Sequence, residues 1–150
     1  MQDTDAANNQ RKKVVDKHYI HEVYTYALLA HLQGTLITKF YGLFSLEIPV
    51  SGLATRVVRL IVIEYISGVS MQQAHPGRYS LHSRQQIMEW VIDFESLVLQ
   101  LDIALTDLCP RNVMLPNTSD HPQRVIVFLD FGGAIFGLTQ VEIDKSLPDS

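Results

Sequence analysis

The stretch Thr106-Asp107-Leu108-Cys109-Pro110-Arg111-Asn112-Val113-Met114-Leu115, followed later by Leu129-Asp130-Phe131-Gly132, decides the fold of this chain. Two short apolar runs, Val113–Leu115 and Val125–Leu129, are separated by a polar connector over 116–123 that is rich in turn-forming residues. Apolar runs on either side of such a connector predict a β-hairpin. A hairpin brings its two ends together, so we expect Asn112 and Asp130 to be neighbours in space.

Asn112 and Asp130 are candidate metal ligands. Mg²⁺ takes carboxylate and amide oxygens and leaves coordination positions for substrate phosphates. Asp107 lies on the loop that leads into the hairpin, and a carboxylate there can orient or deprotonate a hydroxyl nucleophile. Asp130 or Asn112 alone is more typical of a turn, in which Asp and Asn bind the loop backbone, and Asp107 alone could be a loop residue bonded to nearby amides or to Arg111. Their combination and spacing predict a site for Mg²⁺ and phosphate groups.

This combination resembles the signature of the protein-kinase-like superfamily, in which H-R-D-L-x-x-x-N is followed by D-F-G. The chain matches these motifs at Asp107, Leu108 and Asn112, and at Asp130, Phe131 and Gly132. The sequence Asp-Leu-Cys-Pro-Arg-Asn is also similar to the D-L-x-P-x-N form shared by protein kinases and kinase-like small-molecule phosphotransferases. The resemblance implies ATP and Mg²⁺ as cofactors, Asp107 as the catalytic acid that accepts the hydroxyl proton, and Asn112 and Asp130 as metal ligands.

The chain departs from the family pattern at several positions. Leu105 stands where the signature has His, and Thr106 stands where it has Arg. In the family that His helps to hold the loop against the metal-binding turn, and Leu105 cannot supply its hydrogen bonds. The sequence also contains no Gly-rich G-x-G-x-x-G loop and no Val-Ala-Ile-Lys-like strand. Lys12 and Lys13 precede the first helix too closely to leave room for such a strand.

Composition limits the class of protein. A chain of 150 residues with 47% hydrophobic residues can bury one core, so we expect a single domain. The net charge of −4 gives no electrostatic reason to expect nucleic acid or an anionic membrane as partner. The single cysteine, Cys109, excludes an internal disulfide and favours a reducing compartment. The sequence has no apolar signal core and no uncharged run long enough to span a bilayer, so a cytoplasmic protein is expected.

The first half of the chain is expected to form a helix followed by a hairpin. Residues 1–16 are polar and lack periodicity, so we expect a disordered lead-in. A helix is predicted over 17–33, because Val23, Tyr26, Ala27 and Ala30 follow the i, i+3, i+4, i+7 spacing. Two strands are then predicted at Phe40–Leu46 and Val57–Ile66, joined by a turn that includes Gly52.

The second half begins with a polar connection over 69–81 and a second helix. Ser83 and Gln86 form a capping-box pattern at the helix start. One apolar face then continues for about four turns; it consists of Ile87, Trp90, Val91, Phe94, Val98 and Leu101. The apolar run Ala134–Leu138 precedes a polar tail over 139–150. The order predicts an α+β chain. By resemblance this is a partial protein-kinase-like fold over 17–138, with a small-lobe helix and hairpin, hinge, long helix, catalytic loop and metal-site hairpin.

The resemblance also assigns roles upstream of the hairpin. It implies that Glu22 is the helix glutamate that pairs with a strand lysine; the alternative is an ordinary solvated helix acid. At the hinge, the carbonyl of Glu64 and the backbone groups of Ile66 would bind adenine, with Ile63 at the back of the pocket. The alternative there is a strand that ends at Gly68.

Two classes of function follow. The first is ATP- and Mg²⁺-dependent phosphoryl transfer to the hydroxyl of a protein Ser/Thr or of a small molecule. The second is a catalytically inactive pseudokinase-type binding or scaffold protein, or a fragment of a longer kinase, because the phosphate-binding elements and most of the large lobe after Asp-Phe-Gly are missing. Self-association through exposed apolar surface is also expected, because the first helix and its two strands lack the sheet they would pack on.

Overall fold

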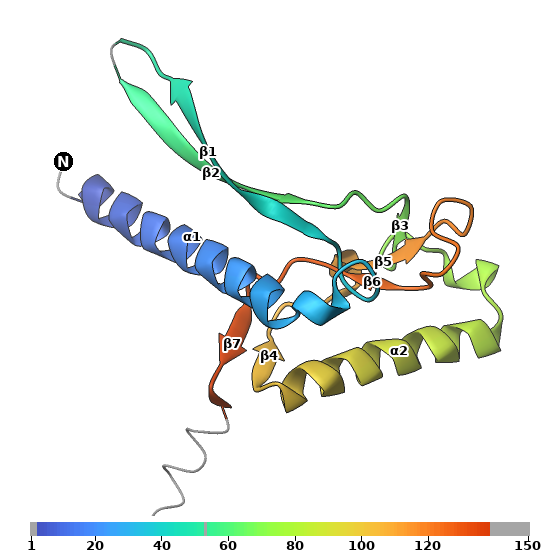
Figure 1. Cartoon of the computed structure of the whole chain (residues 1–150). Coiled ribbons are helices and arrows are strands. Elements are labelled where there is room, and N and C mark those ends of the chain that lie inside the picture. The colour runs from blue at the N-terminus through green and yellow to red at the C-terminus, as the bar shows by residue number, and fades with distance from the viewer. Residues whose placement is uncertain (1–2, 53, 139–150) are drawn as a thin grey trace, which may run out of the picture.

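The computed structural model describes residues 3–52 and 54–138. Within these ranges the chain is a mixed α+β structure, with two α-helices and three small antiparallel sheets (Figure 1). The predicted α+β class is confirmed at this level. The polar tail predicted over 139–150 lies outside the described residues. In the part of the chain that the structure describes, no helix is both long enough and apolar enough to cross a membrane.

Helix α1 (Asp3–Leu28) starts much earlier than expected, since residues 3–16 form its first half and not a disordered lead-in. This segment contains Ala, Gln, Arg and Lys, which are good helix formers and need no apolar face in a solvated helix. The helix packs through its other half, where Thr25 and Tyr26 are fully buried. Ala27, expected on the buried face, is exposed. A 3-10 turn, η1 (Ala30–Leu32), follows the helix.

Strands β1 (Phe40–Pro49) and β2 (Thr55–Ile63) form the expected antiparallel hairpin. Gly52 lies in the connecting turn with φ +90°, a conformation that favours glycine. The hairpin projects from the rest of the molecule, and its far end diverges from the start of α1 (Figure 1). Many of its large apolar side chains are exposed; they are Tyr41, Leu43, Phe44, Leu46, Ile48, Val57, Leu60 and Val62.

A three-stranded sheet contains the hairpin that the sequence predicted around the candidate site. Its strands are β3 (Gly68–Ser70), β5 (Val113–Pro116) and β6 (Val127–Phe128), in the order β3-β5-β6. Val113 pairs with Phe128, which confirms the hairpin. Strand β3 was expected to be a polar connection, but it pairs with β5. Gly68 permits this pairing, because a Cβ there would collide with the carbonyl oxygen of Leu115.

Helix α2 (Leu81–Gln100) follows a 3-10 turn, η2 (Pro76–Arg78). The capping box expected at Ser83 and Gln86 is wrong. The cap is Ser80, whose extended backbone lets its hydroxyl oxygen accept a bond from the Ser83 amide at 3.0 Å. Phe94 is buried, and its ring stacks on Phe128 with centroids 3.8 Å apart. Helix α2 therefore covers the three-stranded sheet.

A third sheet pairs β4 (Ile103–Leu105) with β7 (Ala134–Phe136). Neither strand was predicted from the sequence. Leu105 pairs with Ala134, so the loop that contains Asp107 and the turn that contains Gly132 leave the same end of this sheet. The pairing of two distant segments thus brings the loop that contains Asp107 (the acid loop) close to the turn that contains Asp130 and Gly132.

The core lies where α1, α2 and the three-stranded sheet meet. The chain between η1 and β1 also contributes, because the Phe128 amide donates to the Leu36 carbonyl at 2.8 Å and Ile37 forms a bridge to the same strand. The largest fully buried side chains include Tyr26, Leu29, Ile37, Phe94, Ile103, Ile126 and Phe128.

Candidate functional site

The β5–β6 hairpin brings the backbone next to Asp130 to Asn112, so the two positions are close along the backbone, while the Asn112 side chain binds Asp107. The amide of Leu129 donates to the carbonyl of Asn112 at 3.0 Å. Asn112 ends a short 3-10 turn, η3 (Pro110–Asn112), and only 5% of its surface is exposed. Its amide nitrogen donates to the backbone carbonyl of Asp107 at 3.0 Å, so Asn112 also fixes the acid loop.

Asp107 is held as a charged acceptor. Arg111 Nη2 donates to both carboxylate oxygens of Asp107, at 2.9 and 2.8 Å. These hydrogen bonds from Arg111 hold the pKa of Asp107 below its usual value, and a bond from the Cys109 thiol acts in the same direction. The side chain of Asp107 is 41% exposed, so the carboxylate remains accessible to a ligand.

Thr106 anchors the acid loop where Leu105 cannot. The Thr106 hydroxyl donates to the carbonyl of Gly133 at 2.6 Å. A Cβ on Gly133 would lie 2.7 Å from Thr106 Oγ1, so this close approach requires glycine. The sequence pattern indicated a loop without its usual anchor, but the second Gly of Gly132-Gly133 allows Thr106 to supply one.

Asp130 lies in the left-handed region of the backbone, with φ +65°. This conformation is uncommon outside glycine, although Asp tolerates it better than most residues. The side chain is exposed, whereas the next residue, Phe131, is only 2% exposed and packs edge-on against the ring of Tyr26 at 5.2 Å. The turn is therefore anchored on α1 through Phe131 and presents the Asp130 carboxylate outward.

Glu22 faces the same turn from α1. Burial and the charge of Asp130 raise the pKa of Glu22 to about 7. A hydrogen bond from the Phe131 amide lowers this pKa, but its effect is smaller. Glu22 and Asp130 line one cavity of about 360 Å³, together with His18 and Arg59. Within residues 3–52 and 54–138 no ion pair to Glu22 is formed, so the lysine partner that the resemblance implies is not in place.

Glu64 has a structural role that the sequence did not reveal. Arg124 Nη1 donates to both carboxylate oxygens of Glu64 at 2.9 Å. Arg124 also donates to the carbonyls of Thr35 and Ile37, each at 2.9 Å. Burial raises the pKa of Glu64, but the hydrogen bonds from Arg124 and from the Lys39 amide outweigh it, so the pKa lies below its usual value. A single Arg in a polar connector carries no sequence signal for this role.

The backbone at the hinge is partly occupied by hydrogen bonds within the chain. The amide of Glu64 is occupied, since it donates to the carbonyl of Lys39 at 2.9 Å. Its carbonyl and the amide of Ile66 have no hydrogen-bond partner in the described part of the chain. Ile66 is buried and Ile63 is half-buried against the core. These are the two positions at which adenine was expected to bind.

The expected metal ligands are Asp130 and Asn112. No group of three or more His, Cys, Asp and Glu side chains that could hold a metal ion occurs among the described residues. The Asp130 carboxylate is exposed, whereas the side chain of Asn112 is buried and donates to Asp107; carboxylate and amide oxygens are both ligand types that Mg²⁺ accepts. Comparison with known protein families and with curated proteins gave no match to this chain.

Proposed function

We propose that this chain is a member of the protein-kinase-like superfamily that binds ATP with Mg²⁺ and transfers a phosphoryl group to a hydroxyl. The observation that carries the proposal is that two pairs of candidate site residues, Glu22 with Asp130 and Asp107 with Asn112, are joined by the backbone bond between Leu129 and Asn112. The charge of Asp130 contributes to the raised pKa of Glu22, and the Asn112 side chain donates a hydrogen bond to the Asp107 carbonyl. The order of elements, from α1 and the β1–β2 hairpin through the hinge to α2 and the two loops, supports a partial kinase-like fold.

The site residues have distinct roles in this proposal. Asp130 and Asn112 hold Mg²⁺, which neutralises the charge of the phosphate groups. Asp107 orients the acceptor hydroxyl and receives its proton, while Arg111 keeps the carboxylate in place. Catalysis depends on positioning and on electrostatic stabilisation, because the protein forms no covalent bond with the phosphoryl group. The acceptor is a protein Ser/Thr or a small-molecule hydroxyl.

Thermal unfolding with and without MgATP tests the binding step. A ligand at about 100 times its Kd adds about 2.7 kcal/mol to the free energy of unfolding, which corresponds to a Tm rise of about 5–10 °C for a chain of this length. Asp130→Asn should abolish the Mg²⁺-dependent rise. Asp120→Asn is a matched control, because Asp120 is an exposed residue of the β5–β6 connector. No rise for the wild type at millimolar MgATP would refute the proposal.

Binding without catalysis, as in a pseudokinase-type scaffold, is the second candidate. It is favoured by Glu22, which forms no ion pair in the described part of the chain. Loss of a preorganised charge at a reacting phosphate costs orders of magnitude in rate. Release of ADP separates the two candidates. If Asp107→Asn lowers the rate while the thermal shift persists, the chain is an enzyme; equal rates for the two proteins identify a binding protein.

A further inference from the structure

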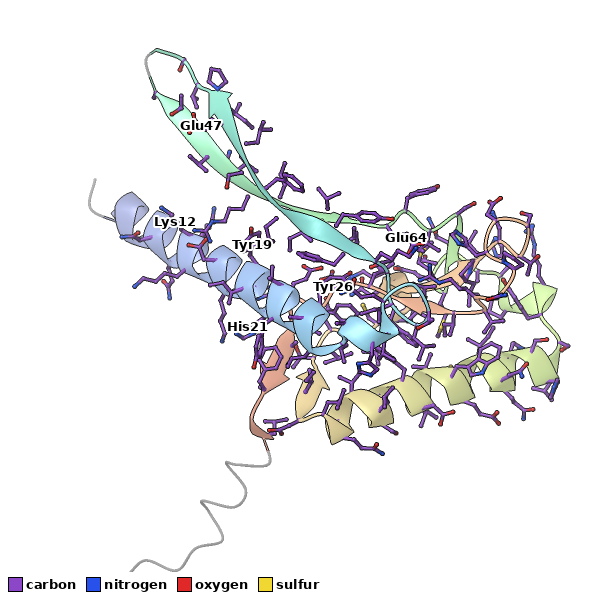
Figure 2. The ribbon with its side chains drawn as sticks, in the orientation of Figure 1. Lys12, Tyr19, His21, Tyr26, Glu47 and Glu64 are labelled. Carbon is purple, nitrogen blue, oxygen red and sulfur yellow. The ribbon has the colours of Figure 1, made fainter. Side chains whose placement is uncertain are left out.

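Arg59 connects two cavities between α1 and β2. One is the cavity of about 360 Å³ that contains Glu22 and Asp130. The other has a volume of about 700 Å³ and extends toward the start of α1 and the far part of the hairpin. Arg59 and Tyr19 line both cavities. Figure 2 shows Tyr19 on the side of α1 that faces the hairpin.

The larger cavity is strongly basic. Four cationic side chains line it: Arg11, Lys12, Arg56 and Arg59. Asp16 is the single acidic residue among the side chains that line this cavity in the described structure. A concave surface lined by charges of one sign concentrates ligands of the opposite sign. The cavity therefore favours an anion that carries several negative charges.

The guanidinium of Arg59 contacts Asp16 and Tyr19, and its ion pair with Asp16 is exposed to solvent. Arg59 Nη1 lies 3.0 Å from Asp16 Oδ1, and the two side chains are 50% and 37% exposed. An ion pair as exposed as this is screened by solvent and salt. The guanidinium also lies over the ring of Tyr19, 5.4 Å from its centroid, a contact that does not use its N–H groups. A phosphate group can thus replace Asp16 at Arg59.

We propose that Arg59 binds the phosphate chain of a nucleotide whose metal ion lies at Asp130, and that the basic cavity continues this site. The inference rests on the proposed function. Side chains alternate along a strand, so Arg59, Ile61 and Ile63 face the same side of β2. The rise of about 3.3 Å per residue separates Arg59 from Ile63 by about 13 Å, which leaves the base at the hinge and the phosphates at Arg59. A strand residue thus provides the phosphate-binding cation that the sequence lacked upstream of α1.

Calorimetric titration with sodium tripolyphosphate, MgATP and adenosine tests the role of Arg59. Arg59→Gln should weaken tripolyphosphate and MgATP by about tenfold or more, because a bidentate charged contact is lost, and should leave adenosine unchanged. Asp16→Asn should tighten tripolyphosphate a few-fold, because it removes the competing carboxylate. Arg78→Gln, at an exposed arginine outside both cavities, is the matched control and should change nothing.

Unchanged tripolyphosphate affinity in Arg59→Gln would overturn the inference, and so would an equal loss in Arg78→Gln, which would indicate non-specific ionic binding. If Arg59→Gln does not fold, the tripolyphosphate affinity of Asp16→Asn is the test. An affinity equal to that of the wild type would then contradict the role of Arg59. Asp130→Asn separates this inference from the proposed function. Tripolyphosphate binding without Mg²⁺ should survive that change, whereas the Mg²⁺-dependent part of ATP binding should be lost. A protein that binds tripolyphosphate through Arg59 but shows no Mg²⁺ dependence would refute only the proposed function.

Discussion

Removal of Arg124 should destabilise the whole chain, because one side chain holds three separate segments together. Its guanidinium contacts the Glu64 carboxylate and the carbonyls of Thr35 and Ile37. The side chains of Arg124 and Glu64 are only 9% and 15% exposed, so the pair is largely shielded from solvent. In Arg124→Ala the Glu64 carboxylate would lose two hydrogen bonds and keep the one from the Lys39 amide, and the carbonyls of Thr35 and Ile37 would each lose one.

The expected loss is about 3–5 kcal/mol, which is typical when one partner of a buried ion pair is removed. For a chain of this length, that corresponds to a fall in Tm on the order of 10 °C. Urea unfolding followed by circular dichroism measures the change. Arg78→Ala, at an exposed arginine on η2, should stay within about 0.5 kcal/mol of the wild type.

The loss should depend on pH in a defined direction. Because the pKa of Glu64 is lowered in the folded state, its contribution is present above the unfolded carboxyl pKa and is lost as the pH falls through the lower folded value. The difference between wild type and Arg124→Ala should therefore shrink in acid. A double-mutant cycle with Glu64→Leu should give a coupling energy of about 2–3 kcal/mol. A loss below about 1 kcal/mol, or no coupling, would refute the reasoning.

Three other predictions concern the site turn, the helix acid and the hairpin. Because the pKa of Glu22 is raised to about 7, its stabilising effect is present below the unfolded carboxyl pKa and is lost as the pH rises through about 7. Glu22→Gln should remove this decline, as measured by urea unfolding between pH 4.5 and pH 8; an unchanged slope would contradict the burial of this carboxyl. Asp130→Gly should be about 1–2 kcal/mol more stable than Asp130→Ala, because both remove the carboxylate but only glycine relaxes at φ +65°; equal stabilities would argue against the left-handed turn. We expect the exposed hairpin to cause self-association that rises with concentration in sedimentation velocity. Phe44→Lys should weaken it, whereas Leu81→Lys, at an exposed leucine of α2, should not.

Local sequence signals predicted the parts of the fold that form from neighbouring residues. Both hairpins were expected because apolar runs flank polar or glycine-containing turns, and the structure pairs Val113 with Phe128 as predicted. The three-residue strands β3, β4 and β7 were missed because each exists only through pairing with a distant segment, as Leu105 does with Ala134. The cap of α2 was placed three residues late, since Ser80 and Ser83 are equally good capping residues in a sequence.

In the candidate site too, the sequence predicted contacts that arise from local structure and missed contacts between distant segments. The proximity of Asn112 to the Asp130 turn followed from the hairpin alone. The anchor between Thr106 and Gly133 did not, because it requires the β4–β7 pairing and a glycine that allows close approach. The ion pair between Glu64 and Arg124 joins residues 60 positions apart, and both types are common on protein surfaces. Sequence spacing carries no information on such a contact.

Helix α1 packs on the body through its second half, whereas its first half contacts the hairpin only through exposed side chains such as the Asp16–Arg59 pair. His21 contacts the carbonyl of Ala134 at 2.6 Å and Tyr24 packs on the ring of Phe136, whereas Lys12 is exposed on the half that extends away from the body (Figure 2). One continuous helix therefore has two kinetic regimes of amide hydrogen exchange. Deuterium should enter the outer turns by fraying within the dead time of a manual experiment, while the amides around Tyr24 should exchange only when the body opens.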